Sequence, residues 1–182
     1  MKQVTVFGSA KCPVDSEDYQ LAYQIGRVLG QADLNLINGG YSGVMEASAK
    51  GALEGGSSTT GVTLKQFTFP ANQFIQAEVR AESYWERLDY LIQKGDAYVV
   101  LKGGTGTFVE LAMVAELMLK DFSEPRPILV YNPFWRPVIE TLRGEIDAPD
   151  PRFSNFGTSK VDALFTFFDD VEEFSAAISE LK

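Results

Sequence analysis

Residues 101–110, with the sequence Leu-Lys-Gly-Gly-Thr-Gly-Thr-Phe-Val-Glu, form the stretch of this chain whose residue types point most directly to chemistry. The apolar run at 96–101 predicts a buried strand, and the apolar spacing over 111–118 predicts a helix. A strand, a glycine-rich turn and a helix in this order leave backbone N–H groups free at the helix N-terminus, where an anion binds. Thr107 is expected to cap the helix, and Glu110 to project from its first turn beside the anion.

A second glycine-rich turn repeats this arrangement earlier in the chain. Residues 34–38 predict a strand and residues 44–53 predict a helix with a face of small side chains, and Gly39-Gly40-Tyr41-Ser42-Gly43 lies between them. The first predicted strand, residues 4–7, runs into Gly8-Ser9. Parallel strands point their carboxyl ends the same way, so these turns are expected to converge on one cleft.

Neither glycine loop matches a common nucleotide-binding fingerprint. Neither has the spacing G-x-G-x-x-G, and Lys102 precedes its glycines, whereas the lysine of a Walker A loop follows them. A small ligand that carries a phosphate is the plain inference from two such loops.

The charged residues near these loops have structural explanations as well as functional ones. A glutamate in a first helical turn stabilises the helix dipole by up to about 1 kcal/mol, which would account for Glu110 without a ligand. Arg87, on the edge of a helix predicted at 83–94, is of a type that is usually solvated or ion-paired. Lys102 either steadies a phosphate or is simply exposed at a strand end.

The composition narrows the chemistry further. The chain has no histidine, which removes Ser-His-Asp and Cys-His mechanisms and histidine-ligated zinc. A single cysteine, Cys12, excludes an intrachain disulfide and a multi-cysteine metal site. No tight acidic cluster calls for magnesium, and a net charge of -9 argues against a nucleic-acid partner. Catalysis would therefore use carboxylates, Arg, Lys, Tyr or backbone N–H groups, and we expect no metal and no cofactor.

The order of the predicted elements indicates an α/β fold. A length of 182 residues favours one domain, residues 1–182. The alternation of strands and helices predicts a Rossmann-like, doubly wound, mostly parallel sheet with helices on both faces. Residues 65–80 are expected to form a loop over the site, and residues 144–160 a surface excursion. The other elements are strands expected at 59–64, 127–131 and 163–167, and helices at 17–29, 107–120, 134–142 and 171–181.

Nothing in the sequence indicates a membrane. No apolar run approaches the roughly 20 residues of a membrane span. The first residues enter a predicted strand without a signal-peptide pattern. We therefore expect a cytoplasmic protein without a membrane partner.

With both loops and Arg87 considered, the chain resembles the LONELY GUY (LOG) family, also labelled "possible lysine decarboxylase". The family signature Pro-Gly-Gly-x-Gly-Thr-x-x-Glu is similar to residues 102–110 and differs only at its first fixed position, which is Lys102 here. The family loop Gly-Gly-Gly-x-x-Gly-Leu-Met is similar to residues 38–45, and its Glu-Arg-Lys segment to residues 86–88. The resemblance extends from about residue 4 to residue 142.

The resemblance implies a homodimer that hydrolyses the N-glycosidic bond of nucleoside 5'-monophosphates, such as AMP or N6-modified AMP of the cytokinin type. It implies Arg87 and Glu110 as the catalytic pair and requires no pyridoxal phosphate. Leu88 replaces the family's lysine, and Val109 stands where many relatives carry another glutamate. The resemblance therefore implies the catalytic pair but does not define the range of substrates. The residues expected to bind the nucleotide and its phosphate are Gly8, Ser9, Gly39, Gly40, Gly43, Met45, Gly103, Gly104, Thr105, Gly106 and Thr107.

These residues give a consistent reaction scheme. Backbone N–H groups of the glycine loops would hold the 5'-phosphate. Glu110 would face the ribose, where a carboxylate stabilises the positive charge of an oxocarbenium-like transition state or orients the attacking water. Arg87 would fix the phosphate or the Glu110 carboxylate, or assist departure of the base.

Two alternatives remain open from the sequence. The same cleft would serve a binding protein that holds a nucleotide or another phosphorylated ligand without turnover, and a structural protein would bind neither. For the homodimer, the helix at 107–120 is apolar on more than one side, which indicates a second buried face or burial between sheet and loops of one subunit.

Overall fold

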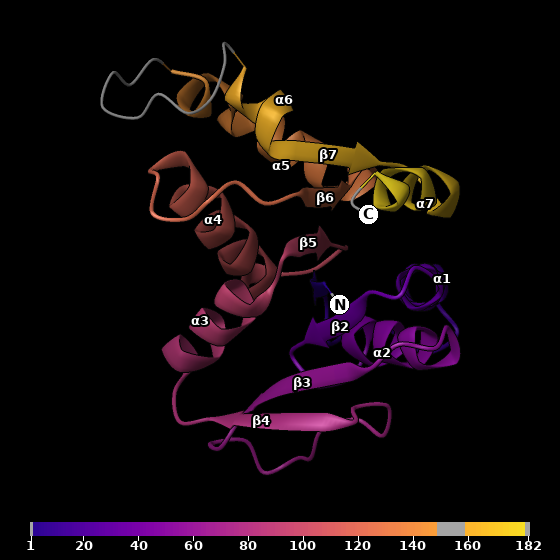
Figure 1. Cartoon of the computed structure of the whole chain (residues 1–182). Coiled ribbons are helices and arrows are strands. Elements are labelled where there is room, and N and C mark those ends of the chain that lie inside the picture. The colour runs from indigo at the N-terminus through magenta and orange to yellow at the C-terminus, as the bar shows by residue number, and fades with distance from the viewer. Residues whose placement is uncertain (1, 149–158, 181–182) are drawn as a thin grey trace.

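A computed structural model describes residues 2–148 and 159–180 (Figure 1). Its centre is a seven-stranded sheet with the order β4-β3-β2-β1-β5-β6-β7, and all the paired strands are parallel. The chain starts at β1, builds outward to β4 and then returns to place β5 on the other side of β1. The strands are β1 Gln3–Phe7, β2 Asn35–Asn38, β3 Thr59–Leu64, β4 Ala77–Ala81, β5 Ala97–Val100, β6 Ile128–Tyr131 and β7 Phe165–Phe168.

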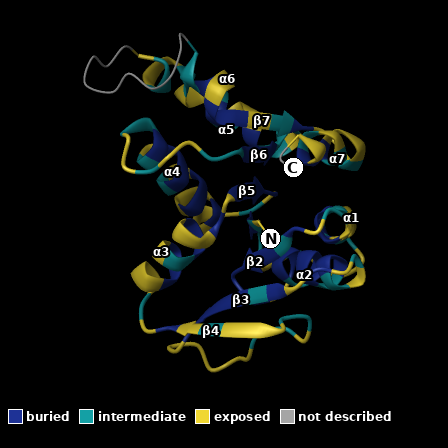
Figure 2. Cartoon of the chain, in the orientation of Figure 1, coloured by how far each residue is buried: buried dark blue, intermediate teal, exposed yellow. Residues whose placement is uncertain are grey.

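Helices cover both faces of this sheet, and each face has its own apolar core. The strands separate the cores by period-two alternation: Val4 and Val6 of β1 face one core, whereas Phe7 faces the other. Figure 2 shows the central strands buried, with exposed residues on the outer sides of the helices. One core contains residues of α1 Glu17–Gln31, α2 Val44–Glu54 and α7 Val171–Ser179; the other contains residues of α3 Tyr84–Lys94, α4 Thr105–Leu119, α5 Asn132–Ile146 and α6 Lys160–Leu164.

The predicted doubly wound α/β fold is confirmed, and its strand order fixes where a ligand can bind. The order in which successive strands are added to the sheet reverses between β1 and β5, which are parallel neighbours. In open parallel sheets, the crevice at the carboxyl ends of such a pair is the usual ligand site. The loops that follow β1 and β5 are the Gly8-Ser9 turn and the glycine-rich residues 103–106.

Three details of the predicted elements were wrong. The interval 65–80, expected to be a loop, contains most of β4 (Ala77–Ala81), which pairs with β3 at the sheet edge. Thr107 does not cap α4, because this helix begins at Thr105 behind Gly104 and has no side-chain cap. Glu110 consequently lies in the second helical turn. Much of the excursion expected at 144–160, residues 149–158, lies outside the described residues, as does residue 181 of the last predicted helix.

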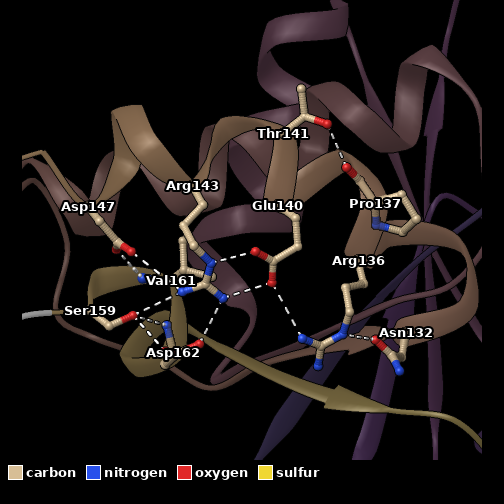
Figure 3. A network of polar contacts seen from close by, with 10 residues as sticks. All are labelled: Asn132, Arg136, Pro137, Glu140, Thr141, Arg143, Asp147, Ser159, Val161 and Asp162. Atoms are coloured by element: carbon tan, nitrogen blue, oxygen red, sulfur yellow. Dashed lines mark hydrogen bonds and ion pairs between the residues drawn. The ribbon is translucent and has the colours of Figure 1, made fainter.

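An ion-pair network joins α5 to α6 (Figure 3). The Arg143 guanidinium donates to Glu140 at 2.8 Å, to Asp162 at 3.0 Å and to the Ser159 hydroxyl at 3.1 Å. Arg143 lies on α5, and Ser159 and Asp162 lie at the start of α6, so one side chain ties the two helices together. No helix among the described residues is long and apolar enough to cross a membrane.

Helices α1 and α2 pack closely because glycines occupy their contact. A Cβ atom added at Gly26 of α1 would collide with the Ser48 carbonyl of α2, and one at Gly51 would collide with the Tyr23 carbonyl. The contact matters for the site, since the first amide of α2, Val44 N–H, donates to Ser9 O at 2.9 Å in the turn after β1.

We predict opposite effects of two glycine-to-alanine substitutions. Gly26→Ala forces α1 and α2 apart and lowers the free energy of unfolding by about 1–3 kcal/mol. Gly144→Ala on α5, where nothing lies within 4 Å of the added Cβ, raises it by about 0.5–1 kcal/mol. Urea unfolding of both variants against wild type measures the difference, and equal effects would contradict the packing.

Candidate functional site

A cavity of about 340 Å³ opens at the carboxyl ends of β1, β2, β3 and β5. This volume is within the range of small-molecule sites. Of the residues expected to bind a ligand, eight line it: Gly8, Ser9, Gly39, Met45, Gly104, Thr105, Gly106 and Thr107. The expected catalytic pair, Arg87 and Glu110, lines it as well.

The N-terminus of α4 forms one wall of the cavity. The first hydrogen bond of the helix runs from the N–H of Phe108 to Gly104 O, at 3.0 Å. The backbone N–H groups before Phe108 therefore have no acceptor within the helix. Nothing lies within 4 Å of a Cβ added at Gly104 or Gly106, so this side of the turn is open. Open amides at the positive end of a 15-residue helix are suited to bind an anion.

Arg87 reaches the cavity from α3 and is almost entirely buried, with 8% of its surface exposed. Its Nε donates to the Val62 carbonyl of β3 at 2.7 Å. The guanidinium lies where a side chain of residue 39 would be, since a Cβ on Gly39 would collide with Nη2. Its Cζ is 5.8 Å from the centre of the Tyr41 ring. These contacts fix the guanidinium in one place, with Nη1 directed at Glu110.

Glu110 is equally buried and pairs with Arg87 at 3.6 Å between Oε1 and Nη1. Burial raises the pKa of Glu110 to about 7, while the Arg87 charge acts in the opposite direction. The pKa of this carboxyl group therefore lies near neutral pH, well above that of an exposed glutamate. A surface glutamate that only complements a helix dipole would not be buried in a cavity wall, so this structural explanation does not suffice.

Three residues of the expected binding set, Gly40, Gly43 and Gly103, do not line the cavity but shape its loops. Gly40 and Gly43 have φ of +79° and +67°, which a side chain disfavours. A Cβ on Gly103 would collide with the Thr107 side chain.

Lys102 does not reach the cavity lining, and its ammonium pairs with Asp18 of α1 at 2.8 Å. Leu88, at the family's lysine position, is buried in the core beneath α3. At these two positions the residue that departs from the family pattern is held by its surroundings, Lys102 by an ion pair and Leu88 by core packing.

The cavity lining also contains residues that sequence reasoning missed, among them the polar and aromatic residues Lys11, Tyr41, Phe67 and Tyr84. The signal available was an aromatic residue inside a glycine loop, at Tyr41, and another in the interval expected to cover the site, at Phe67. Burial raises the pKa of Tyr84, and the nearby Glu110 carboxylate raises it further, so its hydroxyl stays protonated at neutral pH.

The charged side chains that line the cavity are Lys11, Arg87 and Glu110. Two cations against one carboxyl group with a raised pKa make the cavity lining electropositive in a chain of net charge -9. An anionic ligand matches this lining. Among the described residues, no group of three or more acidic or cysteine side chains is placed to hold a metal ion.

The parallel sheet and its switch-point cavity define a Rossmann-like α/β protein. The chain belongs to the SLOG cluster4 family, whose model matches residues 1–121. A protein of Rhodococcoides fascians named cytokinin riboside 5'-monophosphate phosphoribohydrolase is 30% identical over 148 residues, covering 78% of this chain and 74% of that protein. The resemblance to LONELY GUY proteins is thereby confirmed.

Two further comparisons extend this placement. A functionally unassigned protein of Archaeoglobus fulgidus is 30% identical over 130 residues, 71% of this chain and 84% of that protein. The molybdenum cofactor carrier protein of Chlamydomonas reinhardtii superposes with a TM-score of 0.74 at 21% identity, covering 99% of this chain and 97% of that structure. This last likeness shows the fold alone.

We predict that Glu110 makes stability depend on pH. The pKa of Glu110 in the folded protein is about 7, above the ordinary 4.5. The stabilisation of the folded state by the protonated carboxyl group is therefore fully present below pH 4.5 and is lost as pH rises through 7. The unfolding free energy of wild type minus that of Glu110→Gln should fall by about 3 kcal/mol over this range. Urea unfolding at a series of pH values measures it, and parallel profiles would contradict the buried carboxyl group.

Proposed function

We propose that the protein hydrolyses the N-glycosidic bond of nucleoside 5'-monophosphates, releasing the free base and ribose 5-phosphate. The observation that carries the proposal is the buried Arg87–Glu110 pair, which lies in the same cavity as the open N-terminus of α4. The relative named phosphoribohydrolase supports the same reaction class.

The site supports a division of labour between its two parts. The amides of Gly104–Thr107 bind the 5'-phosphate, helped by the helix dipole. Glu110 lies one turn further along α4 and faces the sugar, not the phosphate. This placement explains how a carboxylate and a phosphate share one cavity without strong repulsion.

The reaction needs a water molecule and no redox partner. Water attacks C1' of the ribose while the bond from C1' to the base nitrogen breaks. The ionised Glu110 stabilises the positive charge that develops on the ribose and accepts the proton of the water. The departing base takes up a proton from solvent, and Glu110 afterwards releases the proton of the water to solvent, so that protons balance. Arg87 holds Glu110 in place and keeps part of it ionised at neutral pH.

The protonation state of Glu110 determines how base release is expected to depend on pH. The ionised carboxylate is the active form, so base release rises with pH through about 7 and levels off above it. In Glu110→Gln, this rise of base release with pH should disappear together with the activity.

We predict that Glu110→Gln lowers base release from AMP by at least about 100-fold, because the substitution keeps the shape and removes the charge. AMP and N6-isopentenyl-AMP are incubated with each protein, and free base is measured by chromatography. Glu145→Gln, at an exposed position of α5 outside the cavity lining, is the matched control and should retain full activity. Unchanged turnover in Glu110→Gln would contradict the proposed reaction.

A second candidate function is a binding protein of the same fold, which holds a phosphorylated ligand without cleaving it. The departures from the family pattern at Lys102 and Leu88 favour it, and the molybdenum cofactor carrier protein is a carrier with the same fold. If calorimetry shows that wild-type protein binds AMP, but concentrated wild-type protein releases no base from AMP, the protein is a binding protein and not a hydrolase.

We further propose that the protein is a homodimer that buries the outer side of α4. Phe108 and Val109 of this helix are about 40% exposed, and an apolar groove lies beside them between α4 and α5. We predict that Phe108→Glu shifts the protein from dimer to monomer in sedimentation velocity, because it places a charge in the interface. An exposed phenylalanine in the β3–β4 connection, changed in Phe69→Glu, is the control, and a wild-type monomer would refute the dimer.

A further inference from the structure

The glycine-rich turn at residues 103–106 has little support from side chains of its own. The helix that follows it, α4, begins behind Gly104 and has no side-chain cap. Nothing lies within 4 Å of a Cβ added at Gly104 or Gly106. Glycines lose more backbone freedom than other residues when they are fixed. The shape of this turn, and with it the direction of the first α4 amides, therefore depends on the residues that hold its two ends.

The end of the turn that leaves β5 is held by hydrogen bonds on both sides. Leu101 is the first residue after β5, and the register of β5 with β6 ends at the pair of Val100 and Val130. The Leu101 N–H donates to Phe7 O of β1 at 2.9 Å. The Leu101 carbonyl accepts from the indole Nε1–H of Trp135 at 2.9 Å. A side chain of α5 thus supplies the donor at the point where the ladder with β6 has ended.

The same indole also contacts the other end of the turn. Phe108, in the first turn of α4, stacks on the Trp135 ring with ring centres 6.2 Å apart and 15° between the ring planes. Phe134 meets the Trp135 ring edge-on, with ring centres 5.0 Å apart. Trp135 is only 2% exposed, so these contacts fix it in one place. One rigid side chain therefore bridges residues 101 and 108, on either side of the glycines.

Ordinary core packing accounts for a buried tryptophan with a satisfied N–H, but it does not account for the choice of partners. Both contacts of Trp135 fall on the segment that presents the α4 amides. The next carbonyl, Lys102 O, accepts from the N–H of Ser9, which lines the cavity. The chain entering the turn is thus clamped between Trp135 and Ser9. Displacements of about 1 Å are enough to weaken a binding site, so this clamp bears on the affinity for an anion.

We propose that Trp135 is a positioning residue for the anion site at the start of α4. Trp135 does not line the cavity, and it acts through the Leu101 carbonyl and the Phe108 ring. The inference rests on the part of the proposed function that places a phosphate group on the α4 amides. It does not depend on whether the ligand is hydrolysed.

The first test is Trp135→Phe, which keeps an aromatic ring beside Phe108 and removes the indole N–H. Ribose 5-phosphate, titrated by calorimetry, should bind about fivefold more weakly, because the Leu101 carbonyl loses its donor. The KM for AMP should rise by a similar factor. The kcat should stay within about twofold, since the phosphate is held equally in the ground state and the transition state.

Tyr98→Phe is the matched control. The Tyr98 hydroxyl is also buried, and it donates to Ile92 O at 2.6 Å and accepts from Arg126 at 3.0 Å. Its removal deletes buried hydrogen bonds on the same strand, away from the cavity lining. Tyr98→Phe should therefore lower stability and leave the affinity for ribose 5-phosphate unchanged. An equal loss of affinity in both variants would show a general effect of stability and refute the positioning role.

A spectroscopic test needs no change at the site. The chain has two tryptophans, Trp85 and Trp135, so nitrogen-15 labelling gives two indole N–H signals. Trp85→Phe, at a position that is 69% exposed, assigns them by removing one. Inorganic phosphate added to the wild-type protein should move the Trp135 signal with the midpoint that calorimetry gives for phosphate. A role confined to core packing would leave this signal in place.

The outcomes separate this inference from the proposed function. If Trp135→Phe binds ribose 5-phosphate like wild type, or phosphate binds without moving the Trp135 signal, the positioning role is refuted, while base release by wild type still upholds the hydrolase. If the affinity falls and the signal moves but wild type releases no base, the positioning role holds and the hydrolase is refuted. If wild type binds neither phosphate nor ribose 5-phosphate, both are overturned.

Discussion

The arginine–carboxylate pair inside the cavity sets the requirements that the surrounding structure meets. Arg87 comes from α3 and Glu110 from α4, and both are buried. Burying two ionisable groups is costly unless each has a partner in good geometry. The Val62 carbonyl of β3 accepts from the Arg87 guanidinium, and the missing side chain at Gly39 leaves room for it. Four elements thus converge on one ion pair.

The glycine loops serve this arrangement in two distinct ways. Gly104 and Gly106 leave the start of α4 open, so its amides are accessible to an anion. Gly40 and Gly43 instead allow the backbone to turn, and the buried Asn38 side chain supports that turn by accepting from Gly40 N–H and donating to Met45 O. The glycines of the two loops therefore supply an open helix start and the backbone turn that faces it.

Much of the fold and the central pair could be predicted from the sequence, because strong apolar periodicity and glycine turns are local signals. Strand β4 was missed, since at the sheet edge its Glu78 and Arg80 side chains are exposed and its pattern resembles a loop. The start of α4 was misplaced because Gly104 gives no side-chain capping signal. Tyr41 and Phe67 were not predicted as cavity residues, since they lie in separate loops that meet because β2 and β3 are neighbours in the sheet.

Glu110 is a buried carboxyl group in the cavity lining, and the proposed reaction requires it to face the ligand. Carbon-13 NMR of glutamate-labelled protein, with Glu110→Gln to assign the signal, measures its titration directly. We expect a midpoint near pH 7 in the free protein, and a higher midpoint when ribose 5-phosphate binds, because the ligand adds negative charge and excludes water. A midpoint near 4.5 that ribose 5-phosphate does not move would contradict the account.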